Sequence, residues 1–365
     1  MITIRTFNRA QLEKFVNSQE YAGLDFLPIS RHRAMSQVRN PRVLDHHILL
    51  FMAYENDVPV AYLGALPDRI FLTGDNSTEC AWMSCIWVHE QYRGKQLAQK
   101  LVESCYMAWD KHLLGTEFAE SSGRLFDKMG IFDDLGNKEG VKLYIRSDLY
   151  NILPPRKPVF KHIRGFLKVF DWLTNLLFDL RFLFIKKDFQ NFKHMSSIDG
   201  EVRDFIMRHQ ENELFRRSPD DLQWIIDNPW VIAGKEDDMS RKYHFSSVDA
   251  SFDFLPYTLH DSNRNIVAFL IFTKRNGVLK LPYCYMSEGA AGLVRRCIEH
   301  FAIRWRINSF ICFHPSLVPM FRGKRNIALL TRPFRRRYII SRVLKDKIHT
   351  ERTFVQDGDA DTAFT

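Results

Sequence analysis

The first 150 residues alternate between short apolar runs and stretches in which apolar residues recur every three or four positions. Short apolar runs bounded by polar turns are typical of strands, and the longer period is typical of helices that bury one face. The two patterns follow one another along the chain, which predicts an α/β fold. The expected strands cover residues 2–7, 47–54, 58–66, 80–88, 117–119 and 141–146, and the expected helices cover 11–16, 31–38, 96–109 and 123–129.

A similar order of elements recurs after residue 190. Ser218-Pro219-Asp220-Asp221 has the residues of a helix start, with a serine cap, a proline and an acidic first turn. Arg275-Asn276-Gly277 lies between two apolar runs and predicts a hairpin. The proline-rich stretch 154–158 predicts a linker between the two halves. We therefore expect a first domain over residues 1–150, a linker with an amphipathic helix over 151–190, a second domain over 191–348 and an acidic tail over 349–365.

The segment 166–185 within this linker is rich in Phe, Leu and Trp, and basic residues flank it. Four charged residues interrupt it, so it is not expected to span a membrane. One interpretation is a helix that lies on an anionic membrane surface. The interpretation we favour is a helix packed between the two domains, because a two-domain chain needs such a buried strut. Peripheral membrane contact through 166–185 remains the alternative.

The composition indicates the general class of protein but does not indicate its activity. The chain has 365 residues, of which 45% are hydrophobic, so it can build two cores and global disorder is not expected. The six cysteines are scattered and form no Cys-x-x-Cys pair, so we expect neither a disulfide framework nor a metal site. The N-terminus lacks the apolar core of a signal peptide, and a cytoplasmic location is expected.

A net charge of +9 favours an anionic partner such as a nucleic acid, an anionic lipid or an anionic cofactor, and does not choose among them. A basic run over 332–347 is interpreted as a solvated face in preference to a docking surface for an acidic partner. Three carboxylates in the stretch 357–361 are spaced like the start of a calcium loop, but the central glycine and distal glutamate of such a loop are missing. We expect this tail to be mobile or to cap a domain.

One turn of the chain has the composition of an anion site. The strand expected at Cys80–Val88 leads into Arg93, Gly94 and Lys95, and a helix is expected to start directly afterwards. The unpaired N–H groups of a first helical turn, together with the helix dipole, favour a bound anion. Spacing alone leaves open an ordinary turn with solvated basic residues.

This turn resembles the acyl-CoA loop of the GNAT N-acetyltransferase superfamily. The family pattern is Gln/Arg-x-x-Gly-x-Gly/Ala after a strand that ends in an apolar-x-Val, and Gln91, Gly94, Ile86 and Val88 match it. Gln96 departs from the pattern, since the family has a small residue there, and its side chain could narrow the approach of the pyrophosphate to the backbone.

A second stretch, 125–131, resembles the family signature Leu-Tyr-x-Lys-x-Gly-Phe and follows the first at the expected separation. The resemblance covers residues 1–150 and implies a mixed-sheet acyl-CoA N-acyltransferase fold, with acetyl-CoA or another acyl-CoA as the co-substrate. The second half resembles a further, degenerate unit of this kind, since it lacks the loop pattern, so we expect two tandem GNAT-like domains joined by a helical linker. The implied CoA-binding residues are Ile86, Val88, Arg93, Gly94, Lys95, Gln96, Leu97, Ala98 and Phe126.

The resemblance also implies the chemistry, which is direct attack of a primary amine on the thioester. The backbone N–H of Val88 would stabilise the tetrahedral oxyanion. A carboxylate would take the proton of the amine, and Glu79 and Glu120 are the candidates, against the alternative that each is a surface carboxylate. Phe126 stands where many members have an acidic tyrosine, so solvent or another tyrosine would protonate the leaving thiolate.

The leading hypothesis is therefore an acyl-CoA-dependent N-acyltransferase, with acetyl as the default acyl group and a small-molecule or protein amine as the acceptor. One alternative is a Fem-type transferase that uses aminoacyl-tRNA, which also pairs two GNAT-like units. The intact CoA loop argues against it, and nucleic acid is not the expected partner. The other alternative is a non-catalytic CoA-binding or scaffold protein.

Overall fold

The computed structural model describes residues 1–184, 190–323, 326–348 and 354–364. Its contacts divide the chain into two compact units, neither of which is a continuous stretch. Unit 1 contains residues Met1–Lys138, Ser197–Asp253 and Arg336–Thr365, and unit 2 contains Glu139–Ser196 and Phe254–Arg335.

The sheet of unit 1 follows the order β1-β2-β3-β4-β5-β14. Neighbouring strands pair antiparallel from β1 to β4, β4 pairs parallel with β5, and β14 pairs antiparallel with β5. A helix, α4, connects the parallel pair, as a crossover between parallel strands requires. These strands are β1 Ile2–Asn8, β2 Ile48–Glu55, β3 Val58–Thr73, β4 Asn76–Val88, β5 Leu113–Thr116 and the end of β14 Leu330–Ser341.

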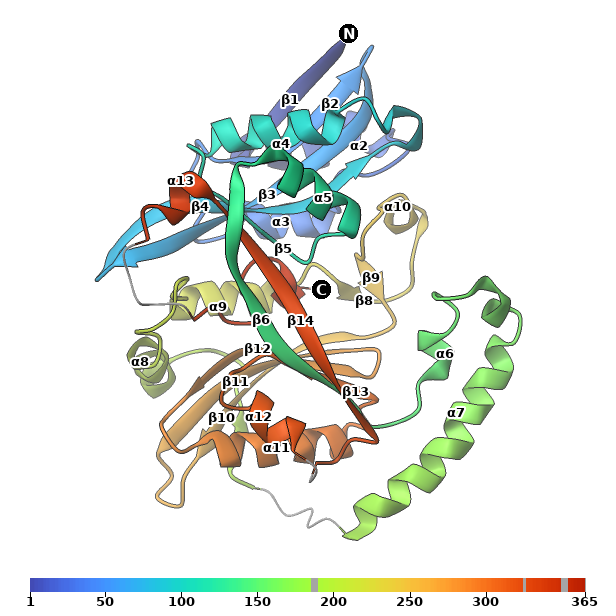
Figure 1. The fold of residues 1–365 in the computed structure, drawn as a ribbon, viewed down its shortest axis with the longest axis vertical. Helices are drawn as coiled ribbons and strands as arrows, with labels where there is room; N and C mark the ends of the chain where they lie inside the picture. Colours follow the sequence, from blue (N-terminus) through green and yellow to red (C-terminus); the bar gives the residue numbers. More distant parts are fainter. Residues whose placement is uncertain (185–189, 324–325, 349–353, 365) are drawn as a thin grey trace. The chain divides into compact units, whose positions relative to one another are not determined.

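Helices and short strands complete unit 1 (Figure 1). Several helices begin at polar caps whose side chains accept a backbone N–H, as Ser218 does from Asp221 for α9. The remaining elements are α1 Arg9–Val16, α2 Gln19–Ala22, α3 Arg31–Val38, η1 Glu90–Tyr92, α4 Leu97–Ala108, α5 Glu120–Met129, the start of β6 Phe132–Tyr144, α8 Gly200–Arg208, α9 Pro219–Asp227, β8 Ile232–Ala233, α10 Asp238–Arg241, β9 Val248–Asp249, α13 Arg342–Lys345 and η4 Thr362–Phe364.

Unit 2 has a sheet of order β6-β13-β12-β11-β10-β7. Its strands β11 and β12 pair antiparallel, β12 pairs parallel with β13, and helix α11 connects that parallel pair. This is the order of β3, β4, α4 and β5 in unit 1. The elements are α6 Leu149–Ile152, η2 Pro158–Lys161, α7 Arg164–Asp179, η3 Leu180–Phe184, β7 Phe192–His194, β10 Phe252–His260, β11 Ile266–Arg275, β12 Val278–Met286, α11 Ala291–Arg304, β13 Ser309–Cys312 and α12 Val318–Arg322.

The expected mixed-sheet α/β fold and most expected elements of the first half are confirmed. The strand expected over 117–119 is wrong, because β5 ends at Thr116. The predicted division at residues 150, 190 and 348 also differs from the two units. The physical reason is an exchange of strands, in which β6 pairs with β13 of unit 2 and β14 pairs with β5 of unit 1. A sequence pattern identifies a strand but not the sheet that it joins.

The tail was expected to be mobile or to cap a domain, and its described residues pack into unit 1. The described residues 355–364 are almost all buried in unit 1, and their carboxylates meet buried arginines. Asp357 pairs with Arg336, and Asp359 accepts a hydrogen bond from Arg217 Nε at 3.0 Å. The aspartates of this stretch are therefore partners of buried arginines and not the start of a calcium loop.

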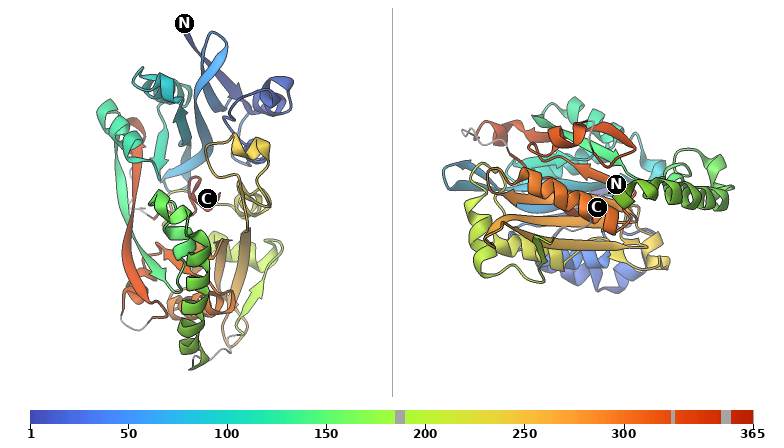
Figure 2. Two further views of the ribbon diagram at one scale, coloured as in Figure 1. Left: turned by 90° about the vertical axis from the view of Figure 1, so that its right-hand side faces the viewer. Right: turned by 90° about the horizontal axis from the view of Figure 1, so that it is seen from below.

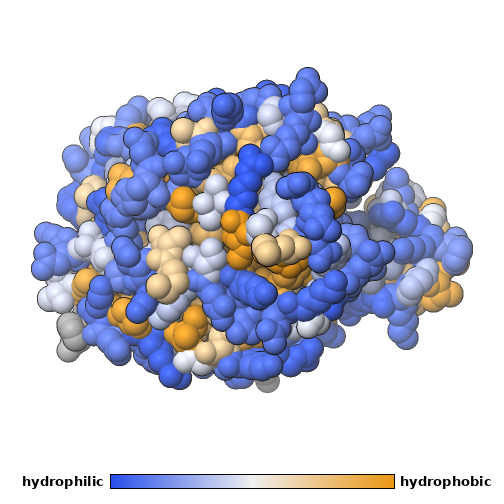
Figure 3. Space-filling model, turned by 90° about the horizontal axis from the view of Figure 1, so that it is seen from above, coloured by the Kyte–Doolittle hydropathy of each residue, from blue (hydrophilic) through white to orange (hydrophobic). Residues whose placement is uncertain are grey.

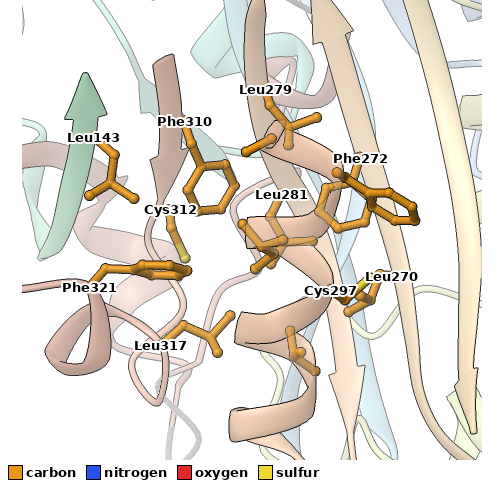
Figure 4. Close-up of a cluster of buried hydrophobic side chains, with 14 of the residues drawn as sticks. Leu143, Leu270, Phe272, Leu279, Leu281, Cys297, Phe310, Cys312, Leu317 and Phe321 are labelled. Atoms are coloured by element: carbon orange, nitrogen blue, oxygen red, sulfur yellow. The ribbon is translucent and has the colours of Figure 1, made fainter. Parts of the chain in front are cut away.

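Each unit has its own hydrophobic core. In unit 2, side chains of β11, β12 and β13 face those of α11 and α12, with Phe310, Leu281 and Cys297 among them (Figure 4). In unit 1 one cluster lies under α1 and α3 and another under α4 and α5. The surface seen in Figure 3 is mostly hydrophilic, with apolar residues interspersed.

Among the described residues, no helix combines the length and the apolar character needed to cross a bilayer. The helix expected over 166–185 is present as α7 and η3, and residues 185–189 lie outside the described part of the chain. The burial that we expected for this segment is wrong. Its large apolar side chains are mostly exposed, Trp172 by 64% and Leu177 by 67%.

Candidate functional site

Strand β4 separates from β5 within unit 1 and opens a pocket. The two strands pair only at Ala81–Leu113 and Trp82–Leu114. Beyond them, Cys85 has φ +56°, and the two residues 85 and 86 of β4 stand opposite Leu63 alone on β3. Such a bulge bends a strand and interrupts its pairing. A cavity of about 260 Å³ lies here, lined by residues 83–86, by 115–119 and by α5.

The expected anion site lies at the end of the same strand. Gly94 has φ +83°, a left-handed conformation that favours glycine, and helix α4 begins at Leu97 with no side-chain cap. Arg93 and Lys95 are exposed beside this helix start, and Lys95 Nζ lies 4.4 Å from the ring centre of Tyr92. Uncapped N–H groups and two cations therefore face solvent together, an arrangement that suits a phosphate ligand.

Gln96 and Ala98 complete this loop. Gln96 takes the left-handed conformation, with φ +60°, and its side chain is exposed. We expected that a side chain at position 96 could narrow the approach of a pyrophosphate to the backbone. In the structure the Gln96 side chain is exposed to solvent. Ala98 is partly buried in the first turn of α4.

The backbone of Val88 has the orientation that an oxyanion donor needs. His89 N–H donates to the Val60 carbonyl at 2.9 Å, while Val88 stands opposite Ala61. In an antiparallel pair, this pattern makes Ala61–Val88 a non-hydrogen-bonded pair. The N–H of Val88 therefore points away from β3. Ile86 lines the cavity, whereas Val88 lies two residues beyond it.

Phe126 of α5 lies in the wall of the cavity and is buried. Its ring meets Phe118 edge-on, with centroids 5.3 Å apart, and also packs on Phe132. Ala119, at the start of α5, lines the same wall. This side of the cavity is therefore apolar and supplies no proton donor at position 126.

A polar cluster also contributes to the cavity wall, through Arg33, Ser84, Trp230 and Asp361. Arg33 of α3 donates to Ser84 Oγ at 2.8 Å and to the Tyr243 hydroxyl at 2.8 Å, and its guanidinium stacks 4.0 Å from the Trp230 ring. Ser84 donates to the carboxylate of Asp361, which comes from the C-terminal segment. All of these groups belong to unit 1.

Burial raises the pKa of the Asp361 carboxyl, and the Arg33 charge and the Ser84 hydrogen bond oppose that shift. Burial also works against the charge of Arg33, but its neighbours Cys85, Tyr243 and Asp361 outweigh it and raise the guanidinium pKa. The cavity thus contains a carboxylate that holds its proton more readily than an exposed aspartate. Glu117 is the second carboxylate in the wall, paired with Arg336 at 2.5 Å.

The structure places Glu79 elsewhere in unit 1. Its Oε2 lies 3.0 Å from His47 Nε2 and 3.7 Å from His46 Nε2, in a separate depression. These three residues are close enough to consider a metal ion. His47 Nδ1 accepts the Leu44 N–H at 3.1 Å, so in a neutral ring the proton is on Nε2 and points at Glu79. This favours a hydrogen bond over a metal–nitrogen bond.

Glu120 is exposed at the first turn of α5 and pairs with Arg124 at 2.5 Å. Neither carboxylate predicted as the base therefore lines the cavity, whereas Glu117 and Asp361 do. Asp361 lies in a stretch that we interpreted as a tail. Its only signal in the sequence is the alternation of three aspartates, and in the structure these lie in a turn that leads into η4.

Part of the chain that forms this site is similar to a known protein family. Residues 17–124 match the family model described as the acetyltransferase (GNAT) family. No curated protein matches the sequence.

Solved structures share the fold over nearly the whole chain. A conserved Enterococcus faecalis protein of unknown function, a probable N-acyltransferase, aligns with a TM-score of 0.55 at 11% identity, over 96% of this chain and 75% of that one. Saccharomyces cerevisiae N-myristoyltransferase with bound myristoyl-CoA aligns with a TM-score of 0.50 at 11% identity, over 93% of this chain and 82% of that one. At this identity the likeness concerns the fold alone.

Proposed function

Since residues 17–124 form a GNAT acetyltransferase domain, we propose that this protein transfers an acyl group from acyl-CoA to a primary amine by direct attack on the thioester. The observation that carries the proposal is the opening between β4 and β5, which puts an uncapped helix start and a carboxylate-lined cavity in the same unit. The first suits the pyrophosphate of CoA, and the second suits a reacting amine.

The donor would be held by backbone groups. The diphosphate would accept hydrogen bonds from the N–H groups at the start of α4, and Arg93 and Lys95 would add positive charge. The pantetheine arm would lie along Ile86 and Val88. The Val88 N–H, which points away from β3, would donate to the oxyanion. A donor of this kind contributes on the order of 3 kcal/mol to the transition state.

Asp361 is the general base in this proposal. A lysine-like amine has a pKa of about 10.4, so making it neutral at pH 7.4 costs roughly 4 kcal/mol. A carboxylate with a raised pKa takes a proton more readily than an ordinary one, which improves transfer from the attacking amine. The neutral nitrogen then bonds to the carbonyl carbon and releases its second proton to solvent. The C–S bond breaks, and the thiolate takes a proton from solvent, because Phe126 cannot supply one.

The acyl group and the acceptor are the finer parts of the proposal. Acetyl is the default acyl group, and the acceptor is a small-molecule or protein amine. The test is release of free CoA from acetyl-CoA and from longer acyl-CoA donors, measured against a panel of primary amines.

Turnover of one donor and one amine would support the proposal and identify the pair. Tight binding of CoA with no turnover on any amine would instead favour a non-catalytic CoA-binding protein. Weak CoA binding together with tight, strongly salt-dependent tRNA binding would favour an aminoacyl-tRNA-dependent transferase.

A further inference from the structure

Helix α7 of unit 2 packs against the rest of its unit with its polar side. Asp171 accepts hydrogen bonds from the Ser147 hydroxyl at 2.6 Å and from the Leu149 and Tyr150 N–H groups. One turn later Asn175 exchanges two hydrogen bonds with the Ser147 backbone, and another turn later Asp179 pairs with Arg146 at 2.7 Å. These three positions, spaced by four residues, lie on one side of the helix.

The other sides of α7 are apolar and exposed, which reverses the usual orientation of an amphipathic helix on a globular unit. Both views in Figure 2 show α7 as one long rod (green). A patch continuous along α7 and η3 is exposed by 41–67% at each residue. We call it the α7 patch, and it consists of Phe166, Val169, Phe170, Trp172, Leu173, Leu176, Leu177, Leu180 and Leu183.

The exposed charges of the segment that contains the α7 patch are basic. Over the described residues 149–183 the acidic residues are Asp171 and Asp179, and both are engaged on the inner side. The exposed charges of the same stretch are basic and gather at the N-terminal end of α7: Arg156, Lys157, Lys161, Arg164 and Lys168.

We propose that the α7 patch docks on an anionic lipid bilayer, with α7 in the plane of the interface. An apolar helix face inserts among acyl chains and headgroups, a tryptophan suits the headgroup level, and basic residues gain from anionic lipid. A second copy that met this patch would present the same basic residues, and its described residues 149–183 offer no unengaged carboxylate to pair with them. Charge complementarity therefore favours the bilayer over a second copy.

The experiment is sedimentation of the full chain with vesicles of phosphatidylcholine alone and of phosphatidylcholine mixed with phosphatidylserine. We expect binding to the mixed vesicles that weakens with added salt. The double variant Leu173→Glu/Leu177→Glu should lower the partition coefficient by roughly tenfold or more, because it places two anions in the apolar patch. The matched control, Val58→Glu/Met107→Glu, adds the same charge at exposed apolar residues of unit 1 and should retain most of the binding.

All four substituted side chains are at least half exposed, so both variants should fold, and circular dichroism checks this. No binding of the unaltered chain to mixed vesicles would overturn the proposal. An equal loss in the control variant would also overturn it, since net charge would then explain the binding. Sedimentation velocity without vesicles provides a further arm: a dimer that the α7 variant alone disrupts would assign the patch to a second copy and reject the bilayer.

Discussion

Ser84 of β4 donates a hydrogen bond to the carboxylate of Asp361, 277 residues further along the chain. Ser84 also accepts from Arg33, so the carboxylate is joined to a buried cation through one hydroxyl. This contact brings the end of the described chain to the strand that borders the cavity. It also makes Asp361 the carboxylate whose role is most directly testable.

Asp361→Asn should lower kcat by roughly a hundredfold or more, since a positioned general base contributes about that much. The amide keeps the shape of the side chain and can still accept from Ser84, so the affinity for acyl-CoA should change little. Steady-state kinetics and CoA-binding calorimetry separate the two effects. In the unaltered enzyme, kcat/KM should rise with pH through a pKa above that of an ordinary aspartate, because burial raises the pKa of Asp361.

Glu79→Gln and Glu120→Gln are the matched comparison, because both are carboxylates of unit 1 outside the cavity. We expect each to retain most of the activity. A large loss in either, with Asp361→Asn nearly unaffected, would return the base to the residues that the sequence suggested.

Gly94→Glu should weaken CoA binding strongly while the fold survives. The substitution puts a negative charge and a side chain with φ +83° at the proposed pyrophosphate site, where an added Cβ meets no atom within 4 Å. Gly74→Glu is the control, because Gly74 also has a positive φ of +57° and open space, but lies in the turn between β3 and β4. Calorimetry with CoA should detect a loss in the first variant alone, and equal affinities would contradict the assigned loop.

Glu213→Gln should make unit 1 more stable at alkaline pH. Burial, reinforced by Asp359, raises the pKa of Glu213 from 4.5 to about 8. A carboxyl whose pKa rises on folding binds its proton more tightly in the folded state, so the free energy of unfolding falls as the pH rises from 4.5 towards 8.

The amide cannot ionise and can still accept the 2.6 Å hydrogen bond from Gln356. At pH 8 the variant should gain roughly 4 kcal/mol over the unaltered chain, and at pH 4 almost nothing. Denaturant unfolding at several pH values measures this. The exposed neighbour substitution Glu211→Gln should show no such trend, and a parallel gain there would refute the assignment.

Arg217→Ala should destabilise unit 1 by about 3–5 kcal/mol, because it removes the arginine that pairs with the buried Asp359 and leaves Asp68 with Arg42 alone. Arg217 binds Asp68 through two hydrogen bonds, of 3.0 and 2.6 Å, and also binds Asp359. Arg203→Ala removes the exposed pair with Asp220 and should cost far less, because water screens an exposed ion pair. Similar losses in the two variants, measured by thermal unfolding, would mean that the buried pairs do not anchor the C-terminal segment.

The sequence predicted best what local pattern determines. The loop at 93–98, its preceding strand and its following helix were all recognisable, because a strand period, a glycine and a helical period stand next to one another. Phe126 was named from the resemblance of residues 125–131 to the family signature, and it lines the cavity. The β-bulge at Cys85 was not predicted, since a non-glycine residue with positive φ leaves no mark in a hydrophobic pattern.

The remaining parts of the site depend on pairings between distant segments. Asp361 lies in a short polar stretch that gives no sign of burial until Arg217, Arg336 and Arg33 are placed around it. The prediction for helix α7 failed in the opposite direction: an apolar stretch normally predicts burial, and this one is mostly exposed. Here Asp171, Asn175 and Asp179 provide the packing side, and only the structure shows which side of the helix faces its unit.

Because β14 completes the sheet of unit 1 beside β5, the N-terminal half cannot finish folding while the ribosome is still translating the middle of the chain. Strand β5 can pair with β14 only after residues 338–340 have been synthesised, and the cavity wall is complete only once Asp361 is present. A nascent chain stalled before this point would expose an unpaired β5, which chaperones recognise and which invites aggregation. Assembly of the proposed active site therefore follows synthesis of residue 361.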